Sequence, residues 1–229
     1  MCGRYTLRSD LKRLARLFQV EEVRLPLFDP RYNVAPSQDV LAVREIDGRR
    51  ELVELKWGLV PRWSKDPTIG YRMINARSET VAEKPSFRSA FKSRRCLIPA
   101  DGFYEWKKTG AKTRQPYFIH LNDDQPFAFA GLWEYWQGDG EVIESCALCT
   151  TEANELMRPL HDRMPVILPA ESYAQWLDPD NQATEALANL LEPFPAQAMA
   201  AHPVSTYVNK PANQGPECVQ PIENEARHD

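Results

Sequence analysis

Nineteen prolines are spread along this chain of 229 residues, and they limit how long its regular elements can be. Proline fixes φ and lacks a backbone N–H, so it interrupts helices and the central strands of sheets. The intervening segments show short alternating apolar patterns bounded by turn residues, with a few helical patterns and no internal repeat. This organisation predicts the α+β class, with a mostly antiparallel, barrel-like sheet and flanking helices. With 43% hydrophobic residues, the chain can bury a substantial core as one domain or two tightly joined lobes.

Turn signals organise the predicted strands. Asp47-Gly48 predicts a hairpin between residues 41–46 and 53–59, and Asp101-Gly102 predicts a turn between residues 96–100 and 103–107. Further strands are predicted at residues 117–121, 127–135 and 142–150. Helices are predicted at residues 151–158, 170–177 and 182–191, and after Ser9, which is expected to cap a helix that buries Leu11, Leu14, Leu17 and Phe18. The polar stretch from Asn209 is expected to be partly disordered.

The chain has no apolar run near 18 residues and no charged-then-apolar leader, which predicts a cytosolic protein without a membrane span. Its odd number of cysteines lacks framework spacing, so reduced thiols are expected. These cysteines are Cys2, Cys96, Cys146, Cys149 and Cys218. Cys146 and Cys149 lie on a predicted strand, where residues three apart point to opposite faces. Because no second pair accompanies them, no metal site is expected.

The formal net charge of −4 conceals an asymmetry between the two halves of the chain. Residues 1–115 carry 24 Lys and Arg against 14 Asp and Glu, whereas residues 116–229 carry 4 against 18. The basic excess is dense at residues 86–95, which include Phe87 and Phe91, and Trp57, Trp63 and Tyr71 lie shortly before. Basic residues among aromatics suit single-stranded nucleic acid. A solvated charged face over ordinary core aromatics is the open alternative.

Cys2 directly follows the initiator methionine. Removal of Met1 would place a free α-amine beside its thiol. Such a 1,2-aminothiol condenses with an aldehyde through the amine and closes through sulfur to a thiazolidine. The alternative is that Cys2 is a small buried hydrophobic residue.

Three polar residues are candidates for catalytic roles. Glu105 lies between aromatics on a predicted strand, where burial would raise its pKa and allow proton transfer near neutral pH. His161 lies in a proline-bounded turn, and histidine titrates near physiological pH. Asn75 supplies a neutral donor and acceptor beside Arg77. Each also has a structural interpretation, as an edge-strand glutamate, a structural histidine and a strand-end asparagine.

Six segments in order resemble the SRAP-domain family of abasic site processing proteins. They are Met1-Cys2-Gly3-Arg4, Arg31-Tyr32-Asn33-Val34-Ala35-Pro36, Trp57-Gly58-Leu59-Val60-Pro61, Asn75-Ala76-Arg77-Ser78-Glu79, residues 95–106 (RCLIPADGFYEW) and His161-Asp162-Arg163-Met164-Pro165. The resemblance extends from Cys2 to about Pro221, so residues 1–221 are expected to form one SRAP domain, with residues 222–229 as a polar acidic tail.

This resemblance implies capture of abasic sites in single-stranded DNA as part of the response to DNA damage, including the SOS response. The α-amine of processed Cys2 would form a Schiff base with the sugar aldehyde, as in lyase chemistry, and the thiolate would close the thiazolidine cross-link. Glu105 would move protons during both steps. His161 would protonate or deprotonate the sugar oxygen and would assist reversal of the cross-link. Asn75 would hold the N-terminal segment and the DNA in register.

The resemblance also implies DNA contacts. Arg4 and Arg77 would hold the phosphates beside the lesion, while Trp63 and Pro36 would stack on or wedge against bases. No cofactor or membrane is implied, and we expect a monomer.

Two other functions stay open from the sequence. The family is described as autoproteolytic, and Cys2, His161 and Asn75 have the composition of a cysteine hydrolase, so a peptidase or hydrolase is one alternative. Removal of the protein's own Met1 agrees with both interpretations. A noncatalytic single-strand binding module, in which Cys2 only packs, is the other.

Overall fold

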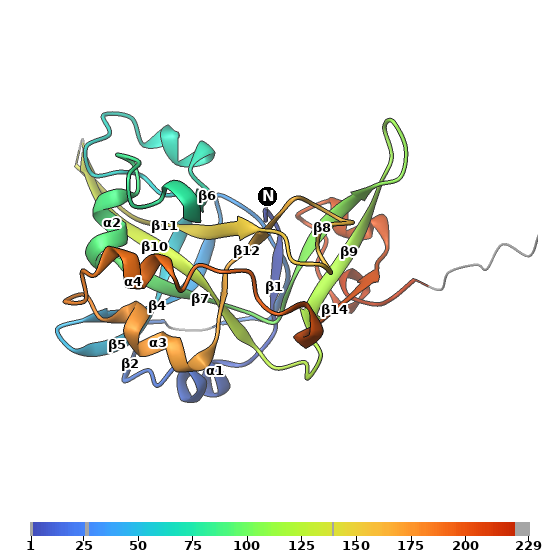
Figure 1. Ribbon diagram of the computed structural model, residues 1–229, viewed down its shortest axis with the longest axis horizontal. Helices are drawn as coiled ribbons and strands as arrows, with labels where there is room; N and C mark the ends of the chain where they lie inside the picture. The colour runs from blue at the N-terminus through green and yellow to red at the C-terminus, as the bar shows by residue number, and fades with distance from the viewer. Residues whose placement is uncertain (1, 26–27, 139, 223–229) are drawn as a thin grey trace, which may run out of the picture.

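A computed structural model describes residues 2–25, 28–138 and 140–222 and confirms the α+β class (Figure 1). Five strands form a closed ring, in the order β11-β10-β7-β4-β5, and a short parallel pairing of β5 with β11 closes it. Their bounds are β4 Asp39–Ile46, β5 Arg49–Trp57, β7 Arg95–Ala100, β10 Phe127–Gly138 and β11 Glu141–Glu152. The sheet is therefore a barrel of mostly antiparallel strands.

Four short strands extend the barrel at its rims. They are β2 Glu22–Val23 on β5, β6 Asn75–Arg77 and β12 Arg163–Pro165 on β11, and β13 Ile167–Leu168 on β10. The hairpin predicted at Asp47-Gly48 is confirmed, since these two residues join β4 to β5 with φ angles of 51° and 73°. Two successive positive φ angles are typical of a type I′ turn, whose twist matches that of the paired strands.

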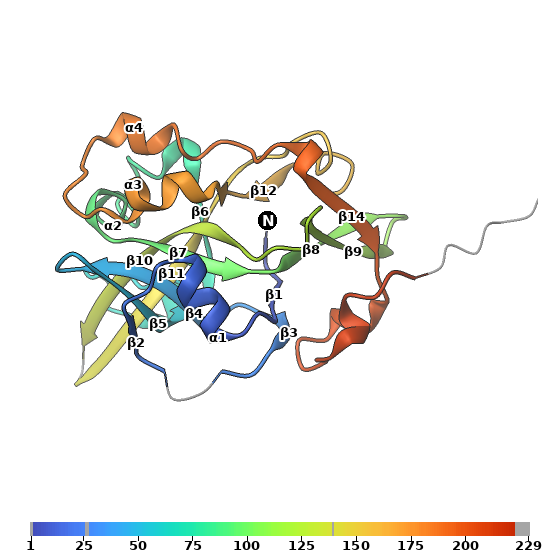
Figure 2. The same cartoon turned by 90° about the horizontal axis from the view of Figure 1, so that it is seen from below.

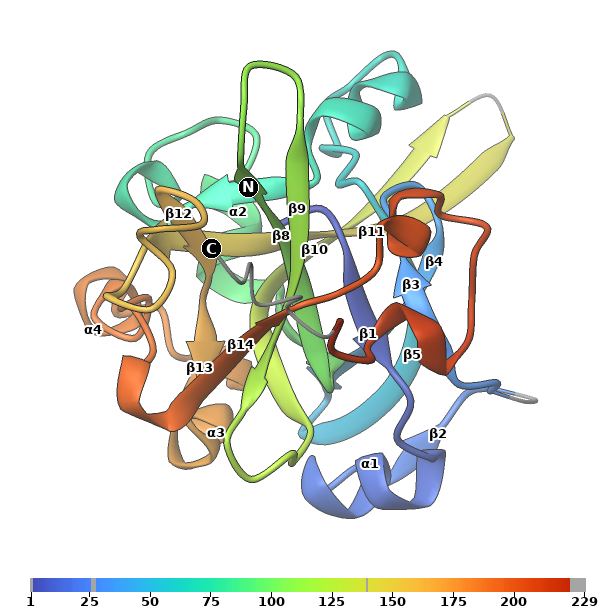
Figure 3. The same ribbon diagram turned by 90° about the vertical axis from the view of Figure 1, so that its right-hand side faces the viewer.

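A second sheet lies beside the barrel (Figures 1 and 3) and has the strand order β14-β9-β8-β1-β3. Its strands are β1 Tyr5–Leu7, β3 Arg31–Val34, β8 Gly102–Lys108, β9 Arg114–Leu121 and β14 Met199–Pro203. The predicted turn at Asp101-Gly102 is present, but it does not form a hairpin. It carries the chain from β7 in the barrel to β8 in the second sheet.

The helices are short and flank the sheets. The α-helices are α1 Leu11–Leu17, α2 Arg88–Ser93, α3 Tyr173–Leu177 and α4 Thr184–Ala188. Short 3₁₀ helices lie at η1 Pro67–Arg72, η2 Ser78–Thr80, η3 Ala170–Ser172, η4 Ala196–Ala198, η5 Thr206–Asn209 and η6 Pro216–Cys218. The helices predicted at residues 170–177 and 182–191 are thus found, although the second is shorter than expected.

One helix prediction is wrong, and the helix predicted after Ser9 is found as α1 but differs from expectation in its cap and in one of its buried residues. The residues predicted as a helix at 151–158 instead continue β11 to Glu152 and then form turns, because Thr151 pairs with Met164 of β12. The first helix is capped by Asp10, whose side chain accepts from the Arg13 N–H, and not by Ser9. Leu17, expected on the buried face of that helix, is 38% exposed.

The basic segment at residues 86–95 is largely structural. Phe87 and Phe91 are buried in the hydrophobic core, as is Trp57, so none of them forms a surface for bases. Arg95 is also buried, and its guanidinium donates to carbonyl oxygens at the ends of α2 and α3. The alternative that Phe87, Phe91 and Trp57 are ordinary core aromatics is therefore confirmed. Trp63 and Tyr71, by contrast, are 60% and 63% exposed.

The chain after Asn209 is more ordered than the sequence indicates. Cys218 in η6 is fully buried, and Val204 bridges to Pro221. Asn213 and Gln214 hydrogen-bond with Asn33 of β3. The expected tail at residues 222–229 lies outside the described residues except for Ile222, which is exposed.

Candidate active site at the N-terminus

The N-terminal segment enters the molecule between the barrel and the second sheet (Figures 1 and 2). On one side, β1 pairs with β8, and the Tyr104 N–H donates to the carbonyl oxygen of Arg4 at 3.0 Å. Extending the register of this pair places Gly3 opposite Glu105. On the other side, the Nδ2 of Asn75, on β6, donates to the carbonyl oxygen of Cys2 at 2.9 Å. Cys2 is therefore held where strands from the two sheets meet.

Glu105 is the buried carboxylate of this site, with 4% of its surface exposed. Burial raises its pKa above the ordinary range, while the positive charge of nearby His161 and the backbone of Trp106 lower it. Desolvation is the largest of these effects because an ionised carboxylate loses its hydration inside the protein. The raised pKa brings proton exchange at Glu105 closer to neutral pH.

The Cys2 thiol has no exposed surface. Burial raises its pKa well above the ordinary value, and the negative charge of Glu105 raises it further, whereas a hydrogen bond with the Arg4 backbone lowers it. The thiol is therefore protonated at neutral pH. A nearby base must accept its proton before the sulfur can act as a thiolate nucleophile.

His161 lies on the loop between β11 and β12. Its Nδ1 accepts from the Arg163 N–H at 2.9 Å and lies 2.8 Å from the Oδ1 of Asp162. The first contact suits a neutral ring that carries its proton on Nε2, and the second suits a protonated ring paired with the carboxylate. The neighbours of His161 thus offer a hydrogen-bond partner to either form of the ring.

The predicted residue Arg4 lies at the edge of the site and contacts protein groups. Its Nη1 donates to the Oδ1 of Asn33 at 2.8 Å and to the Val208 carbonyl at 2.9 Å, and the guanidinium lies over the Trp106 ring. Sequence reasoning missed Asn33 as a residue of this site. Its position within the resembling segment at residues 31–36 was its signal in the sequence. The amide is fully buried, and its Nδ2 donates to the Val208 carbonyl at 3.0 Å as well as to two other carbonyls of the C-terminal segment.

The other predicted DNA-contact residues lie on separate segments. Arg77 is exposed at the end of β6, two residues after Asn75. Trp63 is exposed on a loop, where its Nε1 donates to the Pro85 carbonyl at 3.3 Å. Pro36 is half-buried directly after β3. The structure thus brings Cys2, Asn75, Glu105 and His161 together, and Arg77 lies on the same short strand as Asn75.

Within the described ranges, no group of three or more His, Cys, Asp or Glu side chains is arranged to hold a metal ion. Of the helices described there, none is long and apolar enough to cross a membrane.

The fold and the site define a single α+β barrel protein whose second residue is a buried cysteine beside a buried glutamate. The chain belongs to the SRAP family, described as SOS response associated peptidase, whose family model matches residues 1–211. The abasic site processing protein YoqW of Bacillus subtilis is 47% identical over 96% of this chain and 99% of its own length. The abasic site processing protein YedK of Escherichia coli is 35% identical over 97% of this chain and all of its own.

Vertebrate and structural relatives extend the comparison. The abasic site processing protein HMCES of Gallus gallus is 34% identical, over 97% of this chain and 78% of its own length. A crystal structure of a protein from Bacteroides thetaiotaomicron superposes with a TM-score of 0.87 at 28% identity, and the match covers 97% of this chain and all of the other. The expected SRAP fold is therefore confirmed.

Proposed function

We propose that this protein captures abasic sites in single-stranded DNA by forming a covalent cross-link through Cys2 after Met1 is removed. The observation that carries this proposal is the position of Cys2 against the buried carboxylate of Glu105. The relatives named above are abasic site processing proteins, and an abasic sugar in its ring-opened form presents an aldehyde to such a nucleophile.

The chemistry balances with Glu105 as the proton carrier. Glu105 takes a proton from the α-ammonium of Cys2, and the neutral amine attacks C1′ of the sugar to give a carbinolamine. The protonated Glu105 then donates to the leaving hydroxyl, so water departs and an iminium forms. The Cys2 thiol returns a proton to Glu105 as its sulfur bonds to C1′ and the iminium electrons move to nitrogen. The net reaction joins the ammonium form of the aminothiol and the aldehyde into a thiazolidine, and it releases one water and one proton, which Glu105 holds at the end.

The other site residues support these steps. Asn75 holds the Cys2 carbonyl, and its buried Oδ1 accepts no hydrogen bond within the described residues, which leaves it available to the reacting amine. His161 would carry the proton of the sugar oxygen as the sugar ring opens, and would return it when the cross-link is reversed.

DNA binding would use charge and stacking rather than base readout. Arg77 is exposed and would contact a phosphate beside the lesion, with Arg4 contributing positive charge from the edge of the site. Trp63 and Pro36 would contact neighbouring bases. Recognition of the lesion would come from its aldehyde.

The first test is intact-mass analysis, under denaturing conditions, of protein mixed with a single-stranded oligonucleotide that carries one abasic site. We expect a heat-stable 1:1 adduct without added reductant, with the mass of the two components less one water and without Met1. Cys2→Ala should abolish the adduct, and Cys149→Ala, which changes a buried thiol inside the barrel, should retain it.

Two results would contradict the proposal. No adduct from protein that has lost Met1 would leave a noncatalytic DNA-binding module or a peptidase as the better account. An adduct that persists in Cys2→Ala would assign the chemistry to another nucleophile. An oligonucleotide with all bases intact serves as the substrate control.

We also propose that the protein removes its own Met1. The family description includes peptidase activity, and the Cys2 thiol with Glu105 as base has the composition of a nucleophile and its activator. Protein made by cell-free translation without methionine aminopeptidase should lose Met1 in the wild type and retain it in Glu105→Gln. Retention of Met1 in both would assign its removal to another enzyme.

A further inference from the structure

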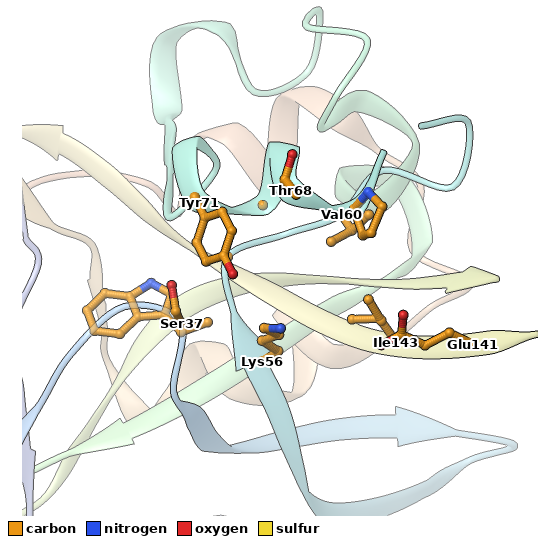
Figure 4. Close-up of a pocket in the computed structure, with 11 residues that line it drawn as sticks. Ser37, Lys56, Val60, Thr68, Tyr71, Glu141 and Ile143 are labelled. Atoms are coloured by element: carbon orange, nitrogen blue, oxygen red, sulfur yellow. The ribbon is translucent and has the colours of Figure 1, made fainter. Parts of the chain in front are cut away.

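A cavity of about 190 Å³ lies between the end of β5, the 3₁₀ helix η1 and the start of β11 (Figure 4). Polar groups of Ser37, Lys56 and Thr68 line it, together with Tyr71, whose ring is at the centre of the view. None of these four residues belongs to the machinery described above. Tyr71 is 63% exposed, so its ring is accessible to a bound molecule.

The cavity shares its framework with the active site. Trp57, one of its walls, donates from Nε1 to the Ile74 carbonyl at 2.9 Å. The next residue, Asn75, donates to the Cys2 carbonyl. Four residues of extended chain reach at most about 14 Å, so Tyr71 and Asn75 lie within that distance. The rise per nucleotide is about 3.4 Å in stacked duplex DNA and larger in an extended single strand, so this distance corresponds to no more than about four nucleotides.

The size of the cavity restricts its occupant. Sites for drug-sized ligands measure about 300–1,000 Å³, so this cavity takes something smaller, of the size of a single ring system. Its floor is fixed by a close approach of two glycines, since a Cβ on Gly70 would lie 2.6 Å from the Gly58 carbonyl oxygen. The hydroxyl and ammonium groups of the walls match the donors and acceptors on the edge of a nucleobase, and the Tyr71 ring offers a stacking surface.

The charge around the cavity favours a neutral ring over a phosphate. Glu141 lines the cavity, and the adjacent surface depression carries Asp39, Glu54 and Glu144. These carboxylates would repel a phosphate. Exposed Arg72, which lies on η1 directly after Tyr71, would attract one. A strand could therefore keep its backbone near Arg72 while one base enters the cavity.

We propose that this cavity binds a single unstacked nucleobase of the DNA strand, within about four nucleotides of the lesion, with Tyr71 as its stacking partner and Lys56 as a hydrogen-bond donor. This inference rests on the proposed function and adds a second recognition point to it. The protein then contacts the strand at two places, the abasic sugar at Cys2 and one intact base at Tyr71.

The test is a base-omission scan. Single-stranded oligonucleotides carry a tetrahydrofuran lesion analogue, which has no aldehyde and cannot cross-link, and a second tetrahydrofuran moved through the four positions on either side. We expect omission at one position to weaken the equilibrium affinity of the wild type by roughly 5- to 150-fold, the usual range for one base–aromatic stack. In Tyr71→Ala this positional penalty should disappear, and in Tyr135→Ala, which changes another exposed tyrosine, it should remain.

A fluorescent base gives a second measurement. 2-Aminopurine at the sensitive position should be quenched on binding wild type and less quenched with Tyr71→Ala. A flat scan, or a penalty that persists in Tyr71→Ala, would overturn the inference. Failure of the proposed function is recognised separately, because wild-type protein would then form no adduct with a true abasic site. Free adenosine that competes as well as the oligonucleotide would show a nucleoside site unrelated to the strand, and would also overturn the inference.

Discussion

At the scale of single residues, the site combines two groups whose burial works against their ionisation. Cys2 and Glu105 both have raised pKa values, with burial as the largest cause, and the negative charge of Glu105 raises the pKa of the Cys2 thiol further. A protonated thiol beside a weakly acidic carboxylate is inactive until a proton moves between them. The arrangement therefore suits proton transfer during a reaction and does not supply a preformed thiolate.

The pH dependence of capture should identify Glu105 as the base. An α-amine titrates near about 8, and the wild-type rate should rise with pH as the carboxylate ionises through its raised pKa and then as the amine does. Glu105→Gln should slow cross-linking by on the order of 100-fold and leave only the amine ionisation in the profile. Single-turnover cross-linking between pH 5 and pH 9 measures this, with exposed Glu155→Gln as control. Equal rates for both variants would refute the assignment.

Glu105 should also lower the stability of the fold at neutral and alkaline pH. Its pKa is raised in the folded state, so the folded protein holds this proton more tightly than the unfolded chain. Stability is then greatest below the unfolded pKa and falls as pH rises through the folded pKa. Glu105→Gln should therefore raise Tm relative to wild type at pH 8 and show a smaller gain at pH 5. A larger gain at the lower pH would contradict this.

At the scale of elements, the corner between β7 and β8 joins the two sheets. Asp101 at this corner accepts hydrogen bonds from the Arg8 and Ser9 N–H groups, and from the Ser9 hydroxyl at 2.6 Å. The same carboxylate thus fixes the link between β1 and α1. Ser9 is occupied here, which explains why Asp10 caps the helix instead.

Loss of the Asp101 carboxylate should loosen this corner. Because buried N–H groups would lose a charged acceptor, Asp101→Ala should lower the free energy of unfolding by about 2–4 kcal/mol. Urea denaturation measures the change, and exposed Asp180→Ala should alter it little. Similar values for both variants would show that the corner contributes no more than a surface residue.

The docking of η1 on the end of β5 depends on Gly70. A Cβ there would lie 2.6 Å from the Gly58 carbonyl oxygen, and backbone cannot yield as a flexible side chain can. Gly70→Ala should cost about 1–3 kcal/mol, in line with overpacked sites. Gly110→Ala is the control, because its Cβ would meet only the Thr113 side chain. Thermal unfolding of the two variants gives the comparison, and an unchanged Tm for Gly70→Ala would show that η1 can shift freely.

At the scale of the whole molecule, the basic and acidic halves of the sequence are not separate bodies. The barrel takes β4, β5 and β7 from the first half and β10 and β11 from the second. Many basic side chains form ion pairs within the protein, such as that of Arg44 with Glu51 at 2.6 Å. Those that are exposed, such as Arg77, contribute positive potential at the surface.

DNA affinity should accordingly depend strongly on salt despite the net charge of −4. The affinity for an intact single-stranded oligonucleotide should fall linearly on a log–log plot against salt, with a slope of about −0.7 per phosphate contact. Arg77→Ala should make that slope shallower by about 0.7. Fluorescence anisotropy titrations measure it, with exposed Lys12→Ala on α1 as control. A slope that Arg77→Ala leaves unchanged would remove Arg77 from the phosphate contacts.

The sequence by itself determined the local structure and the chemical character of the site. Alternation and turn chemistry are local properties, so they identified the Asp47-Gly48 hairpin and the strands at residues 117–121, 127–135 and 142–150, whereas they left open whether Glu105 is buried or faces solvent. The place of Cys2 at the start of the chain indicated the aminothiol chemistry before any fold was known.

Only the tertiary structure decided which segments meet. The barrel closure between β5 and β11 and the contact of Asn75 with Cys2 join residues far apart in sequence, whereas the consecutive strands β7 and β8 belong to different sheets. The helix pattern at residues 151–158 gave way to strand because pairing with β12 outweighed local propensity. Local patterns show which side chains are to be buried, but the partner that buries them depends on strand register and closure, which no short segment contains.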